Sequence, residues 1–384
     1  MKKLLKIILA VLLSIIGLIT TAALCLGVTI LVSSGRVKRT HAREQISRVH
    51  ALEEAYARPD YVPEDEAGMT GFDVEAAIGQ GARLNDIRFV GTHNSYKAYN
   101  PSAEKLMRRL IAPLRFAEGG EWSYGREPLS AQFDKGIRSI ELDVMREKDG
   151  FRCAHIPLVD FACVCPDFSL ALKEIALWSD AHPGHLPITV LIEAKETFLS
   201  GGMGFHRFTL EDVLLLEETV AEALGERLYT PADMLGEHEN FVQLCAANDY
   251  PALGALLGKV LVIYHADMGT TRDYAAHYPT PRAHKMFLSV FSWTLRFEED
   301  TDYACFVIEN ESGSFFMAKN TGEFNMLVRT RMDVFPWRFD EWEAQALSTG
   351  AFILTTDYPP RDDPGEEPHV AAFEGGATAG WRVK

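Results

Sequence analysis

Short apolar runs with strand-like character alternate along most of this chain with longer amphipathic stretches. In the amphipathic stretches apolar residues return at spacings of three and four, which is the helical period. We expect helices over 102–111, 168–181, 210–224, 241–257 (broken before Pro251) and 338–347. The strand-like runs cover 87–90, 139–144, 188–192, 260–264, 286–291, 305–308, 326–328 and 351–354. Repeated strand-then-helix units form parallel sheets, and about eight of them without a glycine fingerprint for dinucleotides favour a closed α/β (β/α)8 TIM-barrel-like fold over a doubly wound sheet.

Three of the apolar runs end in polar residues. The first is followed by Gly91-Thr92-His93-Asn94, a glycine turn that presents an imidazole and an amide together. The second contains Glu141 and Asp143, and the third delivers Glu193 and Lys195. Because successive side chains of a strand point to opposite faces, the two acids of the second run share a face, and so do the two charges of the third.

Carboxylates that face inward at neighbouring strand ends would repel one another and would be expensive to bury without a cation. A hard divalent ion is the simplest such cation. In a barrel the chemistry lies at the carboxyl ends of the strands, and His93, Glu141, Asp143 and Glu193 all fall there. The pattern therefore predicts one site built from several strand ends.

The composition is that of a folded, acidic protein. The chain has 384 residues, is 47% hydrophobic and carries a formal net charge of -16. This length allows one large domain or two ordinary ones. The acidic balance argues against a nucleic acid partner, because phosphate backbones are bound through a surplus of lysine and arginine. No protein partner is evident, and an acidic body would be repelled by anionic lipid headgroups unless another element held it at a membrane.

Residues 7–32 supply such an element, because they contain no charge and consist of aliphatic and small residues. As a helix this segment exceeds the roughly 30 Å hydrocarbon thickness of a bilayer. A cleavable signal usually has an apolar core of only about 7 to 15 residues, so the length favours a retained transmembrane anchor. The basic residues on the two flanks nearly cancel in the positive-inside comparison. We expect the short N-terminal tail to stay in the cytoplasm and the catalytic body to be extracytoplasmic.

The chain accordingly divides into four expected parts. They are an anchor (1–35), a stalk and linker (36–80), a catalytic barrel domain (81–365) and a C-terminal tail (366–384). Five cysteines follow the anchor, an odd number that allows at most two disulfides. We expect either a disulfide between Cys153 and Cys163 or Cys165, or small buried thiols.

Four motifs, in this order, resemble the catalytic X region of phosphoinositide-specific phospholipase C. They are Thr92–Tyr96, Gln132–Val144 (which includes Gly136–Asp143), His155 and Ile192–Lys195. Two later motifs, Val328–Arg331 and Thr355–Pro359, resemble the closing motifs of the bacterial calcium-dependent phosphoinositide phospholipase C-like group and make six in all. The resemblance runs from about Asp86 to Pro359.

The resemblance implies a set of roles. Asn94, Glu141, Asp143 and Glu193 would ligate a calcium ion, and His93 and His155 would flank the scissile phosphate. Calcium takes oxygen ligands, which suits three carboxylates and one amide, with magnesium as the lesser competitor. In the family reaction the inositol 2-hydroxyl attacks the adjacent phosphodiester, yielding diacylglycerol and a cyclic or acyclic inositol phosphate. Glu141 is the candidate base, His93 would stabilise the phosphoryl oxygens and His155 would protonate the leaving oxygen.

Three basic residues are candidates for substrate binding, each with a structural alternative. Lys195 would contact the substrate phosphate or pair with Glu193 or Glu196. Arg329 and Arg331 end the seventh strand, a common phosphate-binding place in barrels, but surface ion pairing is an equal alternative.

Two other functions are compatible with the same pattern. A glycerophosphodiester phosphodiesterase shares a barrel with paired acidic strands, although that family typically opens with His-Arg rather than with His93-Asn94. A non-enzymatic, membrane-tethered module that binds calcium or glycans would not need two histidines beside the metal.

Overall fold

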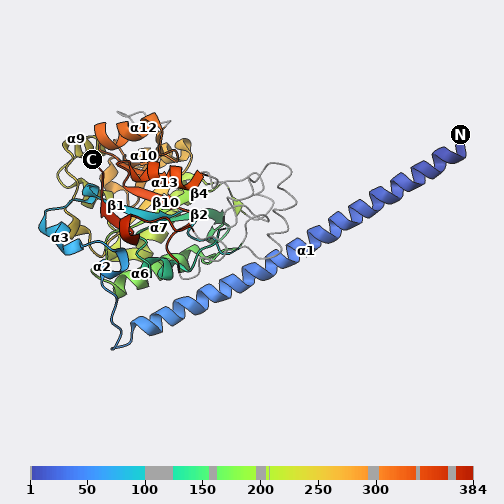
Figure 1. Ribbon diagram of the computed structural model, residues 1–384, viewed down its shortest axis with the longest axis horizontal. Helices are drawn as coiled ribbons and strands as arrows, with labels where there is room; N and C mark the ends of the chain where they lie inside the picture. The colour runs from blue at the N-terminus through green and yellow to red at the C-terminus, as the bar shows by residue number, and fades with distance from the viewer. Residues whose placement is uncertain are drawn as a thin grey trace.

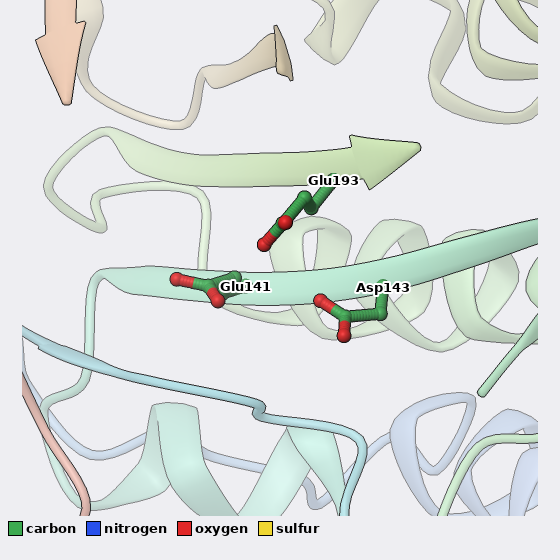
Figure 2. Close-up of side chains that lie close together, drawn as sticks. All are labelled: Glu141, Asp143 and Glu193. Carbon is green, nitrogen blue, oxygen red and sulfur yellow. The ribbon is translucent and has the colours of Figure 1, made fainter. Parts of the chain in front are cut away.

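A computed structural model of the chain describes residues 2–99, 124–154, 162–195, 205–206, 208–292, 302–333, 338–361 and 369–383. Within these residues, the eight predicted strands are present and run in parallel. They are β1 (Ile87–Thr92), β2 (Ser139–Glu147), β4 (Ile188–Ala194), β6 (Val260–His265), β7 (Phe287–Phe291), β8 (Ala304–Ile308), β9 (Leu327–Arg331) and β10 (Ile353–Thr356). Figure 1 shows β1, β2, β4 and β10 close together within the body, and Figure 2 shows β2 and β4 side by side.

The sheet closes on itself because β1 pairs with β10 on one side and with β2 on the other. The closing β1–β2 contact is short and matches Gly91 with Ser139. A Cβ atom on Gly91 would lie only 2.8 Å from the Cβ atom of Ser139, so this close approach requires glycine. The predicted TIM-barrel-like fold is confirmed.

Helices follow the strands on the outside of the barrel. After β1 they are α5 (Leu129–Asp134), α6 (Phe168–Ala181), α7 (Leu210–Leu224), α8 (Pro231–Leu235), α9 (Phe241–Ala247), α10 (Met268–His277), α12 (Phe315–Ala318) and α13 (Phe339–Leu347). The bounds of α6 and α7 are those expected from the apolar period. The expected helix over 241–257 divides into α9 and a 3-10 turn at Leu253–Leu256. The expected helix over 102–111 lies outside the described residues.

Three antiparallel strands extend the barrel at its edges. The strands β3 (Gly150–Cys153) and β5 (Phe205–His206) pair with β2, and β11 (Ala379–Trp381) pairs with β1. The last of these lies in the segment expected to be a tail. That expectation needs correction, because Ala379 and Thr378 are buried and β11 belongs to the sheet.

The segment expected to be a stalk and linker also packs against the barrel. It contains the end of α1 (Lys2–Tyr56) and the short helices α2 (Glu66–Thr70) and α3 (Val74–Gly79). Glu66 of α2 forms a bidentate ion pair with the buried Arg138, with N–O distances of 2.7 and 2.6 Å. The boundary expected between linker and barrel at residue 81 therefore reflects the sequence pattern, because the residues before it also pack against the barrel.

The apolar part of α1 stands clear of the body (Figure 1). It is the one helix among the described residues that is long and apolar enough to cross a membrane, judged by length and composition. A signal sequence near the N-terminus would pass the same test. Side chains along 7–21 are exposed throughout.

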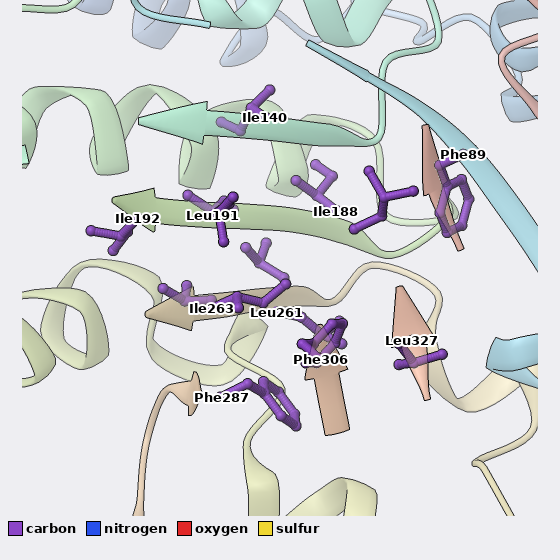
Figure 3. Packing of buried hydrophobic residues seen from close by; sticks show 14 of the residues in the cluster. Phe89, Ile140, Ile188, Leu191, Ile192, Leu261, Ile263, Phe287, Phe306 and Leu327 are labelled. Carbon is purple, nitrogen blue, oxygen red and sulfur yellow. The ribbon is translucent and has the colours of Figure 1, made fainter. Parts of the chain in front are cut away.

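The core consists of apolar side chains that the strands and outer helices bury together. Figure 3 shows part of it, with Phe89, Leu191, Ile263, Phe287 and Phe306 contributed by five different strands. All six cysteines are free thiols, so the expected disulfide is not formed in the structure. Cys153, Cys163 and Cys165 are buried, and the thiol of Cys165 hydrogen bonds with the other two.

Candidate active site

Three carboxylates meet where β2 and β4 end. Asp143 and Glu193 are direct neighbours in the parallel register, and Glu141 lies two residues earlier on the same face of β2. One oxygen from each of the three lies within 4.8 Å of the others. Figure 2 shows Glu193 reaching from β4 toward the two acids of β2. The alternation of Leu142 and Val144 into the surrounding core fixes this orientation.

Two basic side chains compensate these negative charges. The ammonium group of Lys195 donates to Glu193 Oε1 at 2.6 Å and lies 3.4 Å from Asp143 Oδ2. The guanidinium of Arg329 forms an ion pair with Glu141. Burial alone would raise the pKa of Glu193, but the charge and hydrogen bond of Lys195, together with the neighbouring His265 and His93, outweigh burial and lower this pKa to about 2. This low pKa keeps Glu193 ionised although it is only partly exposed.

Asn94, the fourth expected ligand, lies beside the carboxylates. Its Oδ1 accepts a hydrogen bond from the hydroxyl of Tyr96 at 3.1 Å, and the same hydroxyl lies 2.9 Å from Asp143 Oδ2. Asn94 has a positive φ of 48°, a left-handed conformation that asparagine tolerates better than most residues. The turn after β1 thus brings the amide oxygen next to the acids. Three carboxylates and an amide form an oxygen donor set that fits calcium.

Asp357 orients the ring of His93 through the Nδ1 atom. Its Nδ1 donates to Asp357 Oδ1 at 2.8 Å, which leaves Nε2 facing Glu141 Oε1 at 3.6 Å. Burial and then the charge of Arg331 lower the pKa of His93 well below its usual value, so the ring is neutral here. A neutral ring held in this way has a proton acceptor at Nε2.

Arg126 joins the loops that follow β1 and β10. Its guanidinium, almost fully buried, donates to the main-chain oxygens of His93, Thr356 and Asp357 and to Asp357 Oδ1. No periodic or strand-end pattern marks Arg126, and its role was not anticipated. Asp357 could have been identified from the sequence, because it follows a strand end within one of the six motifs, but it was given no role.

The expected substrate-binding residues are already engaged in ion pairs. Lys195 and Arg329 contact the carboxylates directly, and Arg331 pairs with Asp357 and Asp333 at 2.8 and 3.4 Å. None of the three is a surface ion pair, because their side chains are between 6% and 24% exposed. His155 lies outside the described residues.

His265 is a further polar residue of the site. It ends β6 directly beside Glu193 in the register, and its Nδ1 lies 2.9 Å from the hydroxyl of Ser289. Burial lowers its pKa to about 4. His265 directly follows the strand expected over 260–264, and the sequence pattern gave it no role.

Comparisons with known proteins agree with this geometry. The model of a family described as calcium-dependent phosphoinositide phospholipase C matches residues 82–151 and 145–382. Among solved structures, the chain is similar to the calcium-dependent phosphoinositol-specific phospholipase C of a Pseudomonas species. The crystal form with myoinositol has 19% identity and a TM-score of 0.54, with 81% of this chain and 99% of the other covered. A crystal form of the apo enzyme has 18% identity and a TM-score of 0.53, with coverages of 78% and 95%.

At this level of identity the structural likeness supports the barrel fold. A comparison with curated protein sequences found no match. The family match extends over more than half of the chain and confirms the resemblance carried by the six motifs. The chain therefore belongs to the calcium-dependent phosphoinositide phospholipase C family of enzymes.

Proposed function

We propose that this enzyme cleaves phosphatidylinositol-type lipids by attack of the inositol 2-hydroxyl on the adjacent phosphodiester. The new bond joins the 2-oxygen to phosphorus, and the bond to the glycerol oxygen breaks. The products are diacylglycerol and a cyclic inositol phosphate, which water can open to the acyclic form. The observation that carries the proposal is the group of three carboxylates within 4.8 Å of one another, with His93 Nε2 3.6 Å from one of them.

Glu141, Asp143, Glu193 and Asn94 would hold the calcium ion. When bound, calcium would lower the pKa of the attacking hydroxyl and offset the charge on the phosphoryl oxygens. Lys195 contacts two of these carboxylates in the structure. We expect the ion to compete with its ammonium group, which would then be available to the substrate phosphate.

Two neighbouring groups could accept the proton of the 2-hydroxyl. One is the carboxylate of Glu141, as expected from the sequence, and the other is neutral Nε2 of His93. After a proton reaches His93, the imidazolium would remain paired with Asp357 and would stabilise the phosphoryl oxygens. His155 would supply the proton to the departing glycerol oxygen, and Arg329 and Arg331 would add positive charge near the phosphate.

The proposal is tested by mass spectrometry of the products released from phosphatidylinositol vesicles, with calcium and with excess chelator. We expect diacylglycerol and inositol phosphate with calcium, and neither product with chelator. Glu193→Gln should weaken calcium binding by roughly tenfold or more because it removes a charged oxygen ligand, whereas the exposed Glu226→Gln serves as a matched control.

Full activity in excess chelator would contradict the calcium requirement. Release of glycerophosphate in place of inositol phosphate would indicate the glycerophosphodiesterase alternative. We further propose that α1 anchors the enzyme in a membrane, with the barrel on the extracytoplasmic side.

A further inference from the structure

The second half of α1 is fastened to the barrel along one face. The side-chain amide of Gln45, fully buried, both donates to and accepts from the backbone of Asp167, at 2.8 and 2.9 Å. One turn later Arg48 forms a bidentate ion pair with the buried Glu174 of α6 and donates to Val164 O at 2.7 Å. These bonds satisfy buried groups that would otherwise lack partners, so the docking is specific and rigid.

The contacts also fix the direction of α1 relative to the barrel. Tyr56, at its C-terminal end, packs against His182, which lies just before the amino end of β4. Gln45 bonds to Asp167, which bridges to Arg152 of β3, and Arg152 pairs with Met145 in the carboxyl-terminal part of β2. The C-terminal end of α1 therefore lies near the amino ends of the strands. Toward its N-terminus, α1 approaches their carboxyl ends.

Nearer the N-terminus, α1 reaches the hairpin that joins β2 to β3. Lys38 is partly buried and is acted on by the charges of Arg152 and Glu147, on the two arms of that hairpin. Ser34 is still buried at 3% exposure. Lys38 lies only six positions after Val32, the end of the uncharged segment, which corresponds to about 9 Å of helix. Figure 1 shows α1 continuing from this point away from the body.

We propose that α1 is a rigid strut which holds the barrel with its catalytic end facing the bilayer that α1 spans. The inference rests on the proposed function, which makes the carboxyl ends of the strands the catalytic end of the barrel. It also rests on the uncharged segment 7–32, whose exposed apolar side chains would be covered by a bilayer. In this arrangement the Glu141 end of the barrel lies next to the headgroups, and the Gly184 end points away from them. A lipid of the same membrane then has to rise only a short distance out of the bilayer to reach the site.

The charge along the strut fits an anionic membrane surface. Residues 33–43 contain four basic residues and no acidic one, although the whole chain has a net charge of -16. Arg36, Arg39 and Arg43 are exposed. Basic residues next to a span attract anionic lipids by about 1 kcal/mol each. Phosphatidylinositol-type lipids are anionic, so this segment would gather the substrate class beside the catalytic end.

The orientation can be measured without any activity. The full chain is reconstituted in vesicles of phosphatidylcholine and phosphatidylinositol that carry a headgroup-linked energy acceptor. The exposed Cys25 is replaced by serine, and a donor dye is attached through either Lys148→Cys, at the exposed tip of the β2–β3 hairpin, or Gly184→Cys. A side chain at Gly184 meets nothing within 4 Å, so the control substitution is accommodated.

We expect a clearly larger loss of donor fluorescence at position 148 than at position 184, because the two ends are about 27 Å apart along α1. Equal or reversed losses would overturn the proposal. In a second variant, a flexible glycine–serine linker of roughly twelve residues follows Gly35 and leaves the docked half of α1 intact. The difference between the two positions should then shrink, and an unchanged difference would show that α1 does not set the orientation.

An activity measurement separates this inference from the proposed function. The linker variant should lose turnover of phosphatidylinositol in its own vesicle while keeping turnover of a water-soluble inositol phosphodiester. If inserting the linker left the turnover of both substrates unchanged, the result would contradict the strut. If no variant cleaves either substrate, the proposed function fails, whereas the fluorescence difference still decides the orientation.

Discussion

At the scale of single residues, the site depends on side chains that do not touch the proposed metal. Asp357 accepts the Nδ1 proton of His93, and Arg126 holds the backbone around both of them. Arg331 completes the group as the second cation on Asp357. The ring of His93 can therefore present only Nε2 to the carboxylates, which is what either of its proposed roles requires.

Asp357→Asn tests this positioning role. The amide can donate to Nδ1, which would favour the wrong tautomer of His93, so we expect kcat to fall by roughly 10²- to 10⁴-fold. Calcium affinity, measured by calorimetric titration, should change little, because Asp357 is not among the three clustered acids. Partial rescue of kcat by Asp357→Glu would support orientation over a general loss of folding. Weakened calcium binding with normal kcat would contradict the assignment.

The two histidines are proposed to do different jobs, and the leaving group distinguishes them. His155→Ala should damage the lipid substrate far more than a substrate with a nitrophenol leaving group, because a good leaving group needs no proton. His93→Ala should damage both substrates alike, since charge on the phosphoryl oxygens develops whichever group departs. Turnover of both substrates by each variant is the measurement. Equal losses for His155→Ala would mean that another residue is the general acid.

At the scale of elements, short segments outside the eight strand–helix units are tied to the barrel by buried polar contacts. Helix α2 is held through Glu66, whose carboxylate accepts from Arg138 and from the backbone of Leu186. The guanidinium of Arg138 also lies 4.8 Å from the ring centre of Trp178. These contacts explain why a segment with linker-like composition is packed.

Glu66→Ala should therefore destabilise the protein strongly. It leaves the fully buried guanidinium of Arg138 without its charge partner, and breaking a buried ion pair in this way costs about 3 to 5 kcal/mol of unfolding free energy. The control is Arg338→Ala, which removes an exposed ion pair with Glu341 and should change stability by about 0.5 kcal/mol or less. Denaturant unfolding of the full chain in detergent compares the two. Similar small shifts for both variants would mean that the pair does not hold α2.

At the scale of the whole molecule, an acidic body is joined to a helix whose segment 7–32 is uncharged. The net charge of -16 opposes binding to anionic lipid, so the proposed membrane attachment would come from α1. The same helix continues without interruption from the uncharged segment to the docked segment. In the proposed arrangement, one helix would both anchor the barrel and set its orientation.

If α1 is retained, the protein should remain in the membrane fraction after carbonate or high-salt washing. Hydrophobic burial does not weaken under these conditions, whereas attachment through surface charge is screened. Fractionation followed by mass determination of the chain is the measurement. Recovery of a shortened soluble form that begins near Cys25 would show instead that the segment is a cleaved signal.

Eight strands, their order along the chain and the face on which their polar ends lie could be predicted from the sequence alone. These features are local: an apolar run marks a buried strand, and alternation assigns Glu141 and Asp143 to one face. The sequence also determined the uncharged segment at 7–32, because hydropathy and length need no tertiary contact.

Which of these polar groups contact one another depends on the closed barrel and could not be predicted from the sequence. His93 and Asp357 are 264 residues apart, and they are joined because closure of the barrel sets β1 beside β10. The pairing of Arg329 with Glu141 crosses the barrel in the same way, over 188 residues. Local periodicity reports which face of an element is buried, but the partner on that face depends on which strand ends are brought together when the sheet closes. For the same reason the packing of β11, α2 and the docked half of α1 could not be read from their own residues.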